Sequence, residues 1–103
     1  IGGMDRGLDY NPLVKFLSTS SVENIILLPS TNERIEDLFR KYEHNKKIIA
    51  VNNMEEAVKM SYEHTKKNQI CLLSPAAASY GFYLNFEKRG EHFKQLVEEY
   101  SNI

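Results

Sequence analysis

The sequence predicts an α/β fold, specifically a Rossmann-like three-layer αβα sandwich with a mainly parallel sheet. Short continuous apolar runs, which are typical of strands buried on both faces, alternate with longer segments whose apolar residues recur at helical spacing. A strand–helix–strand order with right-handed crossovers gives a parallel sheet covered by helices on both faces. The length of 103 residues suits one small domain, residues 1–103.

Three strands are expected, at residues 23–28, 47–51 and 69–74. Proline cannot donate a hydrogen bond to a strand ladder, so Pro29 and Pro75 end the first and third of these strands. The opening Ile1-Gly2-Gly3 is interpreted as the end of a further strand. The resulting sheet is small, and its strands are expected to be buried on both faces.

Four helices are expected, at residues 11–17, 30–42, 53–67 and 86–100. Ser30 and Glu33 have the spacing of a capping box, and Asn53 is a suitable N-cap for the third helix. Pro12 suits the first turn of the first helix. Glycine inside a helix is about 1 kcal/mol less favourable than alanine, so we expect close packing at Gly90.

Composition excludes several classes of function. The chain has 13 basic and 14 acidic residues, a balance that argues against a nucleic-acid binder or a polybasic membrane module. Its apolar runs are too short to span a bilayer. The single cysteine, Cys71, cannot form an internal disulfide, and we interpret it as a small buried hydrophobic residue.

Three segments, residues 2–9, 29–32 and 74–86, lie where ligands bind in parallel α/β sheets, beyond the carboxyl ends of the strands, and two of them are unusual in composition. The first, residues 2–9, combines glycines with Asp5 and Arg6, and a guanidinium there can bind a carboxylate or phosphate through two parallel hydrogen bonds. The alternative is a plain strand-to-helix turn in which Asp5 and Arg6 form a solvated pair. The residues alone leave both interpretations open.

The second segment, residues 74–86, begins with Ser-Pro-Ala-Ala-Ala-Ser. The alanines leave space beside the backbone, Ser79 supplies a hydroxyl, and a short helical turn would point free N–H groups outward, which together suit a carboxylate. The alternative is a packed alanine-rich turn with Ser79 as an N-cap. The aromatic stretch at residues 80–83 is interpreted as core or domain interface.

The histidines His44, His64 and His92 have no metal-binding spacing, and we interpret them as solvated or hydrogen-bonded surface residues. We find no combination of nucleophile, base and orienting group, so we expect neither catalytic residues nor a metal site within the chain. The residues therefore predict a fold and a face for a small anion. A free-standing α/β module that binds a small anion or regulates a partner remains an alternative.

Two blocks resemble a known family. Residues 72–79, Leu-Leu-Ser-Pro-Ala-Ala-Ala-Ser, followed by residues 85–93, Asn-Phe-Glu-Lys-Arg-Gly-Glu-His-Phe, resemble the C-terminal signature of the D-glutamate-adding enzymes of the Mur ligase family. Residues 2–10, Gly-Gly-Met-Asp-Arg-Gly-Leu-Asp-Tyr, are similar to another block of that family. Residues 18–68 match only in their rhythm of helices and strands.

The resemblance implies a three-domain ligase of the bacterial cytoplasm that acts in peptidoglycan synthesis. An N-terminal domain would hold UDP-N-acetylmuramoyl-L-alanine, and a central domain would hold ATP and Mg²⁺. This chain would be most of the third, amino-acid-binding domain, without the other two, and we expect it to be inactive alone and to bind no cofactor. ATP would convert the substrate carboxylate to an acyl phosphate, which the amine of D-glutamate then attacks.

The resemblance also implies roles for individual residues. Ser79 would bind a carboxylate of D-glutamate, and Phe86 would contact the amino acid through its backbone. Arg6 stands where the family commonly has lysine, and its guanidinium would hold a carboxylate. Asn85 and Arg89 match the motif, and we expect structural roles for both.

Overall fold

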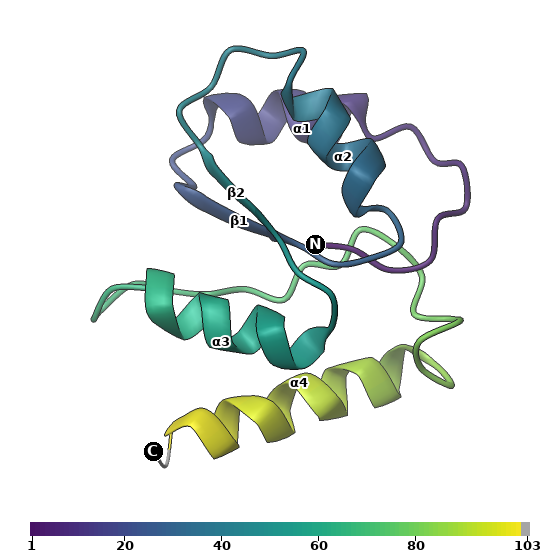
Figure 1. Cartoon of the computed structure of the whole chain (residues 1–103), viewed down its shortest axis with the longest axis vertical. Helices are drawn as coiled ribbons and strands as arrows, with labels where there is room; N and C mark the ends of the chain where they lie inside the picture. Colours follow the sequence, from purple (N-terminus) through teal and green to yellow (C-terminus); the bar gives the residue numbers. More distant parts are fainter. Residues whose placement is uncertain (102–103) are drawn as a thin grey trace.

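A computed structural model describes residues 1–101 and shows a small parallel sheet between two pairs of helices (Figure 1). The elements in chain order are α1 (Asn11–Thr19), β1 (Asn24–Leu27), α2 (Asn32–Phe39), β2 (Lys47–Ala50), α3 (Met54–His64) and α4 (Phe86–Ser101). The strands β1 and β2 pair in parallel, with α2 between them in the chain. The α/β prediction is confirmed.

The strand β1 and the residue that follows it are buried on both faces, as its continuous apolar run predicts. Ile25 and Leu27 pack in a cluster with residues of α1 and α2. Ile26 and Leu28 belong to a second cluster, with residues of α3 and α4. Successive side chains of a strand point to opposite faces, so one short apolar run joins both layers of helices to the sheet.

The opening segment, residues 1–4, extends the sheet beside β1. The amine of Ile1 donates to the carbonyl of Ile26 at 2.9 Å, and the amide of Leu28 donates to the carbonyl of Ile1 at 2.7 Å. On the opposite side of β1, the carbonyl of Leu27 accepts from the amide of Val51, next to β2, at 3.0 Å. The opening segment and β2 therefore lie on opposite edges of β1.

The other side of the opening segment contacts the alanine loop, residues 75–79. The amide of Gly2 donates to the carbonyl of Pro75 at 2.8 Å, and the amide of Met4 donates to the carbonyl of Ala78 at 2.7 Å. The backbone order across the sheet is therefore β2, β1, opening segment, alanine loop. The interpretation of residues 1–3 as the end of a strand agrees with the parallel bridge between Gly2 and Leu28.

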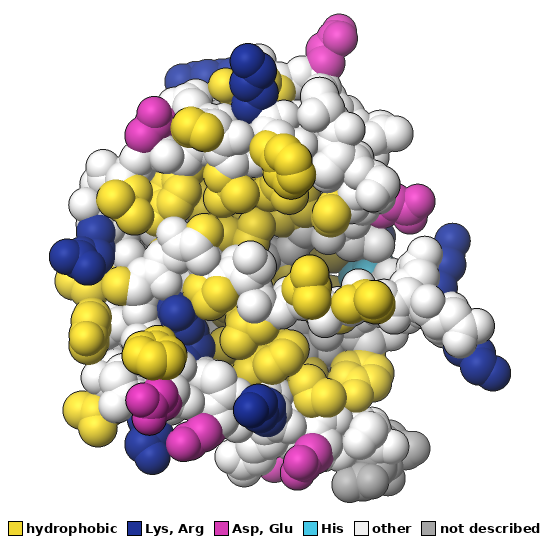
Figure 2. Space-filling view, turned by 180° about the vertical axis from the view of Figure 1, so that it is seen from behind, with side chains coloured by type: hydrophobic (Ala, Val, Ile, Leu, Met, Phe, Trp, Pro, Cys, Tyr) yellow, Lys and Arg dark blue, Asp and Glu magenta, His cyan; other side chains and the backbone are white. Residues whose placement is uncertain are grey.

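The strand predicted at residues 69–74 does not form. Ile70 and Leu72 are 84% and 78% exposed, and Cys71 is exposed as well, so its prediction as a buried residue is wrong. A strand needs a neighbouring backbone to receive its hydrogen bonds. The opening segment supplies one only from Pro75 onward. Hydrophobic side chains spread over much of the face seen from behind in Figure 2.

The capping box predicted at Ser30 is also wrong. The N-cap of α2 is Thr31, and its side chain makes no capping hydrogen bond. The Ser30 hydroxyl instead donates to the carbonyl of Gly3 at 3.3 Å and accepts from the amide of Asp5 at 3.2 Å. A tertiary contact with the opening segment and the turn after it thus replaces the local one.

Other local signals are confirmed. The Asn53 side chain accepts from the amide of Glu56 at 2.9 Å and caps α3, and Pro12 lies in the first turn of α1. The helix α3 ends at His64, three residues before the predicted end. Within residues 1–101, no helix combines the length and apolar character needed to cross a membrane.

The close packing predicted at Gly90 is absent. A Cβ atom built there meets nothing within 4 Å outside its own helix. We therefore predict that Gly90→Ala raises the free energy of unfolding by about 1 kcal/mol, because alanine restricts the unfolded chain and favours the helix. Urea denaturation of both proteins measures the difference. A decrease in stability would contradict the open space beside Gly90.

The buried amine of Ile1 predicts a pH dependence. Burial lowers its pKa from 8.0 to about 6. Between these values the unfolded chain binds more protons than the folded chain, so stability rises with pH. For the chain beginning at Ile1, we expect the free energy of unfolding to increase by about 2 kcal/mol from pH 6 to pH 8. Urea titrations should show this slope, and an N-acetylated chain should lose it. An equal slope in both would contradict the burial.

Candidate functional site

A cavity of about 220 Å³ opens at the carboxyl edge of the sheet. Its walls come from the opening segment, the segments after β1 and β2, the turn after the alanine loop, and α4. The lining residues are Gly2, Gly3, Leu28, Pro29, Asn52, Asn53, Met54, Glu55, Ser79, Phe82, Tyr83, Arg89 and His92. This edge is where the sequence analysis placed a ligand.

The chain topology marks the same place. From the opening segment the chain passes through α1 to β1 on one side. After β2 it passes through α3, on the opposite face, to the alanine loop on the other side of the opening segment (Figure 1). The order of neighbouring backbones thus reverses at the opening segment, and such switch points hold the ligands of open α/β sheets.

Gly2 and Gly3 permit the close backbone packing of this edge. Their φ angles are +145° and +142°, a region that favours glycine. A Cβ at Gly2 would lie 2.3 Å from the carbonyl oxygen of Leu28, and one at Gly3 would lie 2.3 Å from that of Ala78. These glycines therefore admit the neighbouring backbones, in addition to lining the cavity.

Ser79 lies in the cavity wall with only 4% of its surface exposed. Its carbonyl accepts from the amides of Phe82 and Tyr83, at 3.3 and 3.0 Å, which forms a turn after the alanine loop. Its hydroxyl makes no hydrogen bond to any residue within 1–101. A ligand would therefore displace no partner of this hydroxyl in the described part of the chain.

Arg89 supplies a cation to the cavity. It extends from α4, and its Nη1 donates to the carbonyl of Ala77 at 2.9 Å, so it also fixes the alanine loop. Burial lowers the pKa of Arg89 below its usual value. A guanidinium stays charged at neutral pH, so this one can attract an anion. From the sequence, only a structural role was expected for Arg89.

Arg6 and Phe86 are exposed and do not line the cavity. Asn85, next to Phe86, accepts from the amide of Lys88 at 2.9 Å and caps α4, which matches its expected structural role. Phe86 is the first residue of α4. Its amide therefore belongs to the first helical turn, where backbone donors have no partner within the helix.

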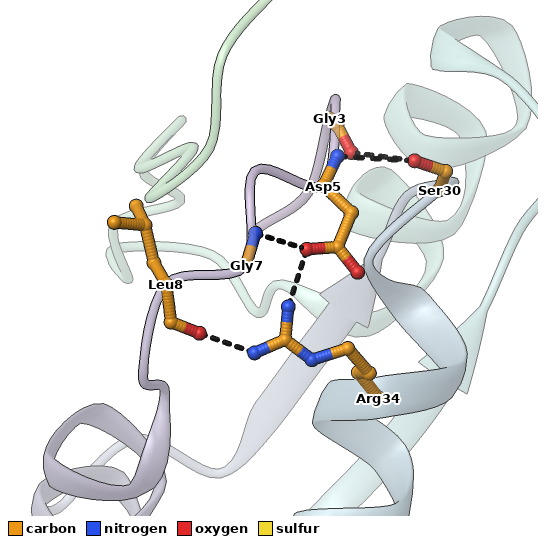
Figure 3. A network of polar contacts seen from close by, with 6 residues as sticks. All are labelled: Gly3, Asp5, Gly7, Leu8, Ser30 and Arg34. Atoms are coloured by element: carbon orange, nitrogen blue, oxygen red, sulfur yellow. Dashed lines mark hydrogen bonds and ion pairs between the residues drawn. The ribbon is translucent and has the colours of Figure 1, made fainter.

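Asp5 pairs with α2 and not with Arg6, the partner in the alternative interpretation of this turn. The carboxylate of Asp5 accepts from the Arg34 guanidinium and, at 2.9 Å, from the amide of Gly7 (Figure 3). Arg34 also donates to the carbonyl of Leu8. These contacts fix the turn after the opening segment to α2.

One wall of the cavity carries a polar network that was not predicted from the sequence. The hydroxyl of Tyr83 lies 2.7 Å from Nδ1 of His92, and Nε2 of His92 lies 3.2 Å from a carboxylate oxygen of Glu55. His92 follows Arg89 by three residues on α4, so both share one helix face. This three-residue spacing is the signal in the sequence that could have placed His92 beside Arg89. Residues 1–101 contain no cluster of three metal-ligating side chains.

No protein-family model matches the chain. Its similar proteins are ligases of one name. It is 40% identical over 99 residues to UDP-N-acetylmuramoylalanine–D-glutamate ligase of Thermoanaerobacter sp. (strain X514). It is 44% identical over 96 residues to the ligase of the same name of Clostridioides difficile (strain 630). The chain is homologous to a segment of these ligases.

The shared segment covers nearly all of this chain and a minor part of each relative. The matches include 95% of the chain and 22% of the Thermoanaerobacter ligase, and 93% of the chain and 21% of the Clostridioides difficile ligase. The D-glutamate ligase of Lactobacillus acidophilus (strain ATCC 700396 / NCK56 / N2 / NCFM) matches in the same way, with 40% identity over 95% of the chain. The chain thus spans about a fifth of the length of these ligases.

The close packing at Gly3 predicts that a larger side chain at this position destabilises the fold. Gly3→Ala should lower the free energy of unfolding by about 1–3 kcal/mol, because the new methyl group overlaps the carbonyl of Ala78. Gly7→Ala is the matched control, since Gly7 also has a positive φ but no neighbour within 4 Å of a Cβ. Denaturation should show the larger loss for Gly3→Ala. Equal losses would contradict the contact between the opening segment and the alanine loop.

Proposed function

We propose that residues 1–103 are most of the amino-acid-binding C-terminal domain of an ATP-dependent ligase that joins D-glutamate to UDP-N-acetylmuramoyl-L-alanine in peptidoglycan synthesis. The observation that carries this proposal is Ser79. It lies in the family-like motif, is almost fully buried, lines the cavity at the carboxyl edge, and its hydroxyl has no hydrogen-bond partner within residues 1–101. The homologous ligases are named for UDP-N-acetylmuramoylalanine and D-glutamate, which supports these substrates.

The chain's task is to bind and orient the amino acid. A carboxylate of D-glutamate accepts a hydrogen bond from the Ser79 hydroxyl, and Arg89 supplies positive charge to the same cavity. The first-turn amide at Phe86 is a further donor for an anion. Arg6, exposed on the turn after the opening segment, holds a carboxylate from the rim when the other domains close over the site.

The reaction itself needs parts of the enzyme outside this chain. We place ATP and Mg²⁺ in the central domain and the UDP-sugar substrate in the N-terminal domain, in the bacterial cytoplasm. ATP transfers its terminal phosphoryl group to the substrate carboxylate, giving an acyl phosphate and ADP. The amine of D-glutamate attacks the acyl carbon, the C–O bond to phosphate breaks, and the amine loses a proton. The chain alone holds the nucleophile and forms no product.

The full-length enzyme tests the substrate and the site together. With ATP, Mg²⁺ and UDP-N-acetylmuramoyl-L-alanine, phosphate release is expected with D-glutamate and not with L-glutamate, L-lysine or L-alanine. Ser79→Ala should raise the KM for D-glutamate about 10- to 100-fold, as expected for a hydrogen bond to a charged group. Ser74→Ala is the matched control, because Ser74 is exposed and outside the cavity.

Two results would contradict the proposal. Equal KM values for Ser79→Ala and Ser74→Ala would remove Ser79 from the site. No phosphate release with any amino acid would favour the free-standing module that binds a small anion, and release with another amino acid would reassign the substrate within the ligase family.

A further inference from the structure

Tyr83, His92 and Glu55 join three separate parts of the chain across one wall of the cavity. Tyr83 lies in the turn after Ser79, His92 in α4, and Glu55 in the first turn of α3. The Tyr83 hydroxyl is 2.7 Å from Nδ1 of His92, whose Nε2 is 3.2 Å from the Glu55 carboxylate. Each nitrogen of the imidazole therefore lies close to an oxygen of another segment.

The chemistry of the three groups favours one direction for the hydrogen bond between Tyr83 and His92. The Glu55 carboxylate lies 3.2 Å from Nε2 of His92 and favours a proton on that nitrogen. With the proton on Nε2, Nδ1 is an acceptor, and the Tyr83 hydroxyl donates to it. Burial, together with the negative charge of Glu55, raises the pKa of Tyr83, so its hydroxyl keeps this proton.

The network is linked to Ser79 through the backbone. The amides of Phe82 and Tyr83 both donate to the carbonyl of Ser79, at 3.3 and 3.0 Å. Fixing the Tyr83 side chain therefore fixes the turn that begins at Ser79. Arg89 holds the preceding side of the same loop through the carbonyl of Ala77. The Ser79 hydroxyl is thus positioned from both sides.

We propose that Tyr83, His92 and Glu55 are positioning residues that hold the Ser79 turn in the geometry that binds the amino acid. This inference rests on the proposed function. A hydroxyl that binds a carboxylate must be held within a fraction of an ångström, and supporting hydrogen bonds provide that precision. Loss of the network should weaken binding of D-glutamate and leave binding of the two other substrates unchanged.

Tyr83→Phe in the full-length enzyme is the direct test, because it removes one hydroxyl and keeps the ring. The KM for D-glutamate should rise about 3- to 10-fold, with unchanged KM values for ATP and UDP-N-acetylmuramoyl-L-alanine. Tyr80→Phe is the matched control, since Tyr80 is exposed and outside the cavity. His92→Leu should raise the same KM, and adding Tyr83→Phe to it should have no further effect.

A spectroscopic measurement reports the network independently of activity. In full-length enzyme with ¹⁵N-labelled histidine at pH 8, the shifts of His92 should show the Nε2–H tautomer with a hydrogen-bonded Nδ1. Tyr83→Phe should move the Nδ1 signal, and Tyr80→Phe should not.

The outcomes separate this inference from the proposed function. Wild-type activity with D-glutamate, together with an unchanged KM in Tyr83→Phe, would overturn the positioning role alone. Equal rises in all three KM values would also overturn it, because they would report a general loss of structure. Wild-type enzyme that does not use D-glutamate would refute the proposed function, and this role with it.

Discussion

The insertion of residues 1–4 between the end of β1 and the alanine loop is the contact on which the rest of the structure depends. It is made mainly by backbone groups: Ile1 pairs with β1, and the amides of Gly2 and Met4 donate to the alanine loop. Glycines at positions 2 and 3 are required because a Cβ at either would overlap a neighbouring carbonyl. Without this pairing the alanine loop would lose its backbone hydrogen bonds beside the carboxyl end of β1.

The same contact determines where a ligand can bind. The chain crosses one face of the sheet before β1 and the other face after β2, so the two paths part at the opening segment (Figure 1). The cavity opens there, with glycine backbone on one side and the Ser79 turn on the other. Arg89 and the Tyr83–His92–Glu55 network hold that turn from α4 and α3. The helices of the second layer thus position the site as well as covering the sheet.

Signals local in sequence predicted the fold well, whereas features that need distant partners were missed. The cap at Asn53 depends on neighbours in the chain, and the two-sided burial of β1 is signalled by its own continuous apolar run; both are confirmed. Ser30 has the sequence of a cap, but Gly3 and Asp5 take its hydroxyl in the folded chain. Residues 69–74 have the composition of a strand but no adjoining backbone to pair with. The motif located Ser79, while the His92 network joins three segments that no local pattern connects.

The central claim is that the amino acid binds where the opening segment meets the Ser79 turn. Hydrogen–deuterium exchange of the full-length enzyme, saturated with UDP-N-acetylmuramoyl-L-alanine and a non-hydrolysable ATP analogue, tests it most directly when D-glutamate is added. We expect slower exchange at residues 2–4 and 79–83, because ligand contacts stabilise both segments of the cavity wall. Slower exchange confined to other parts of the chain, with these two segments unchanged, would contradict it.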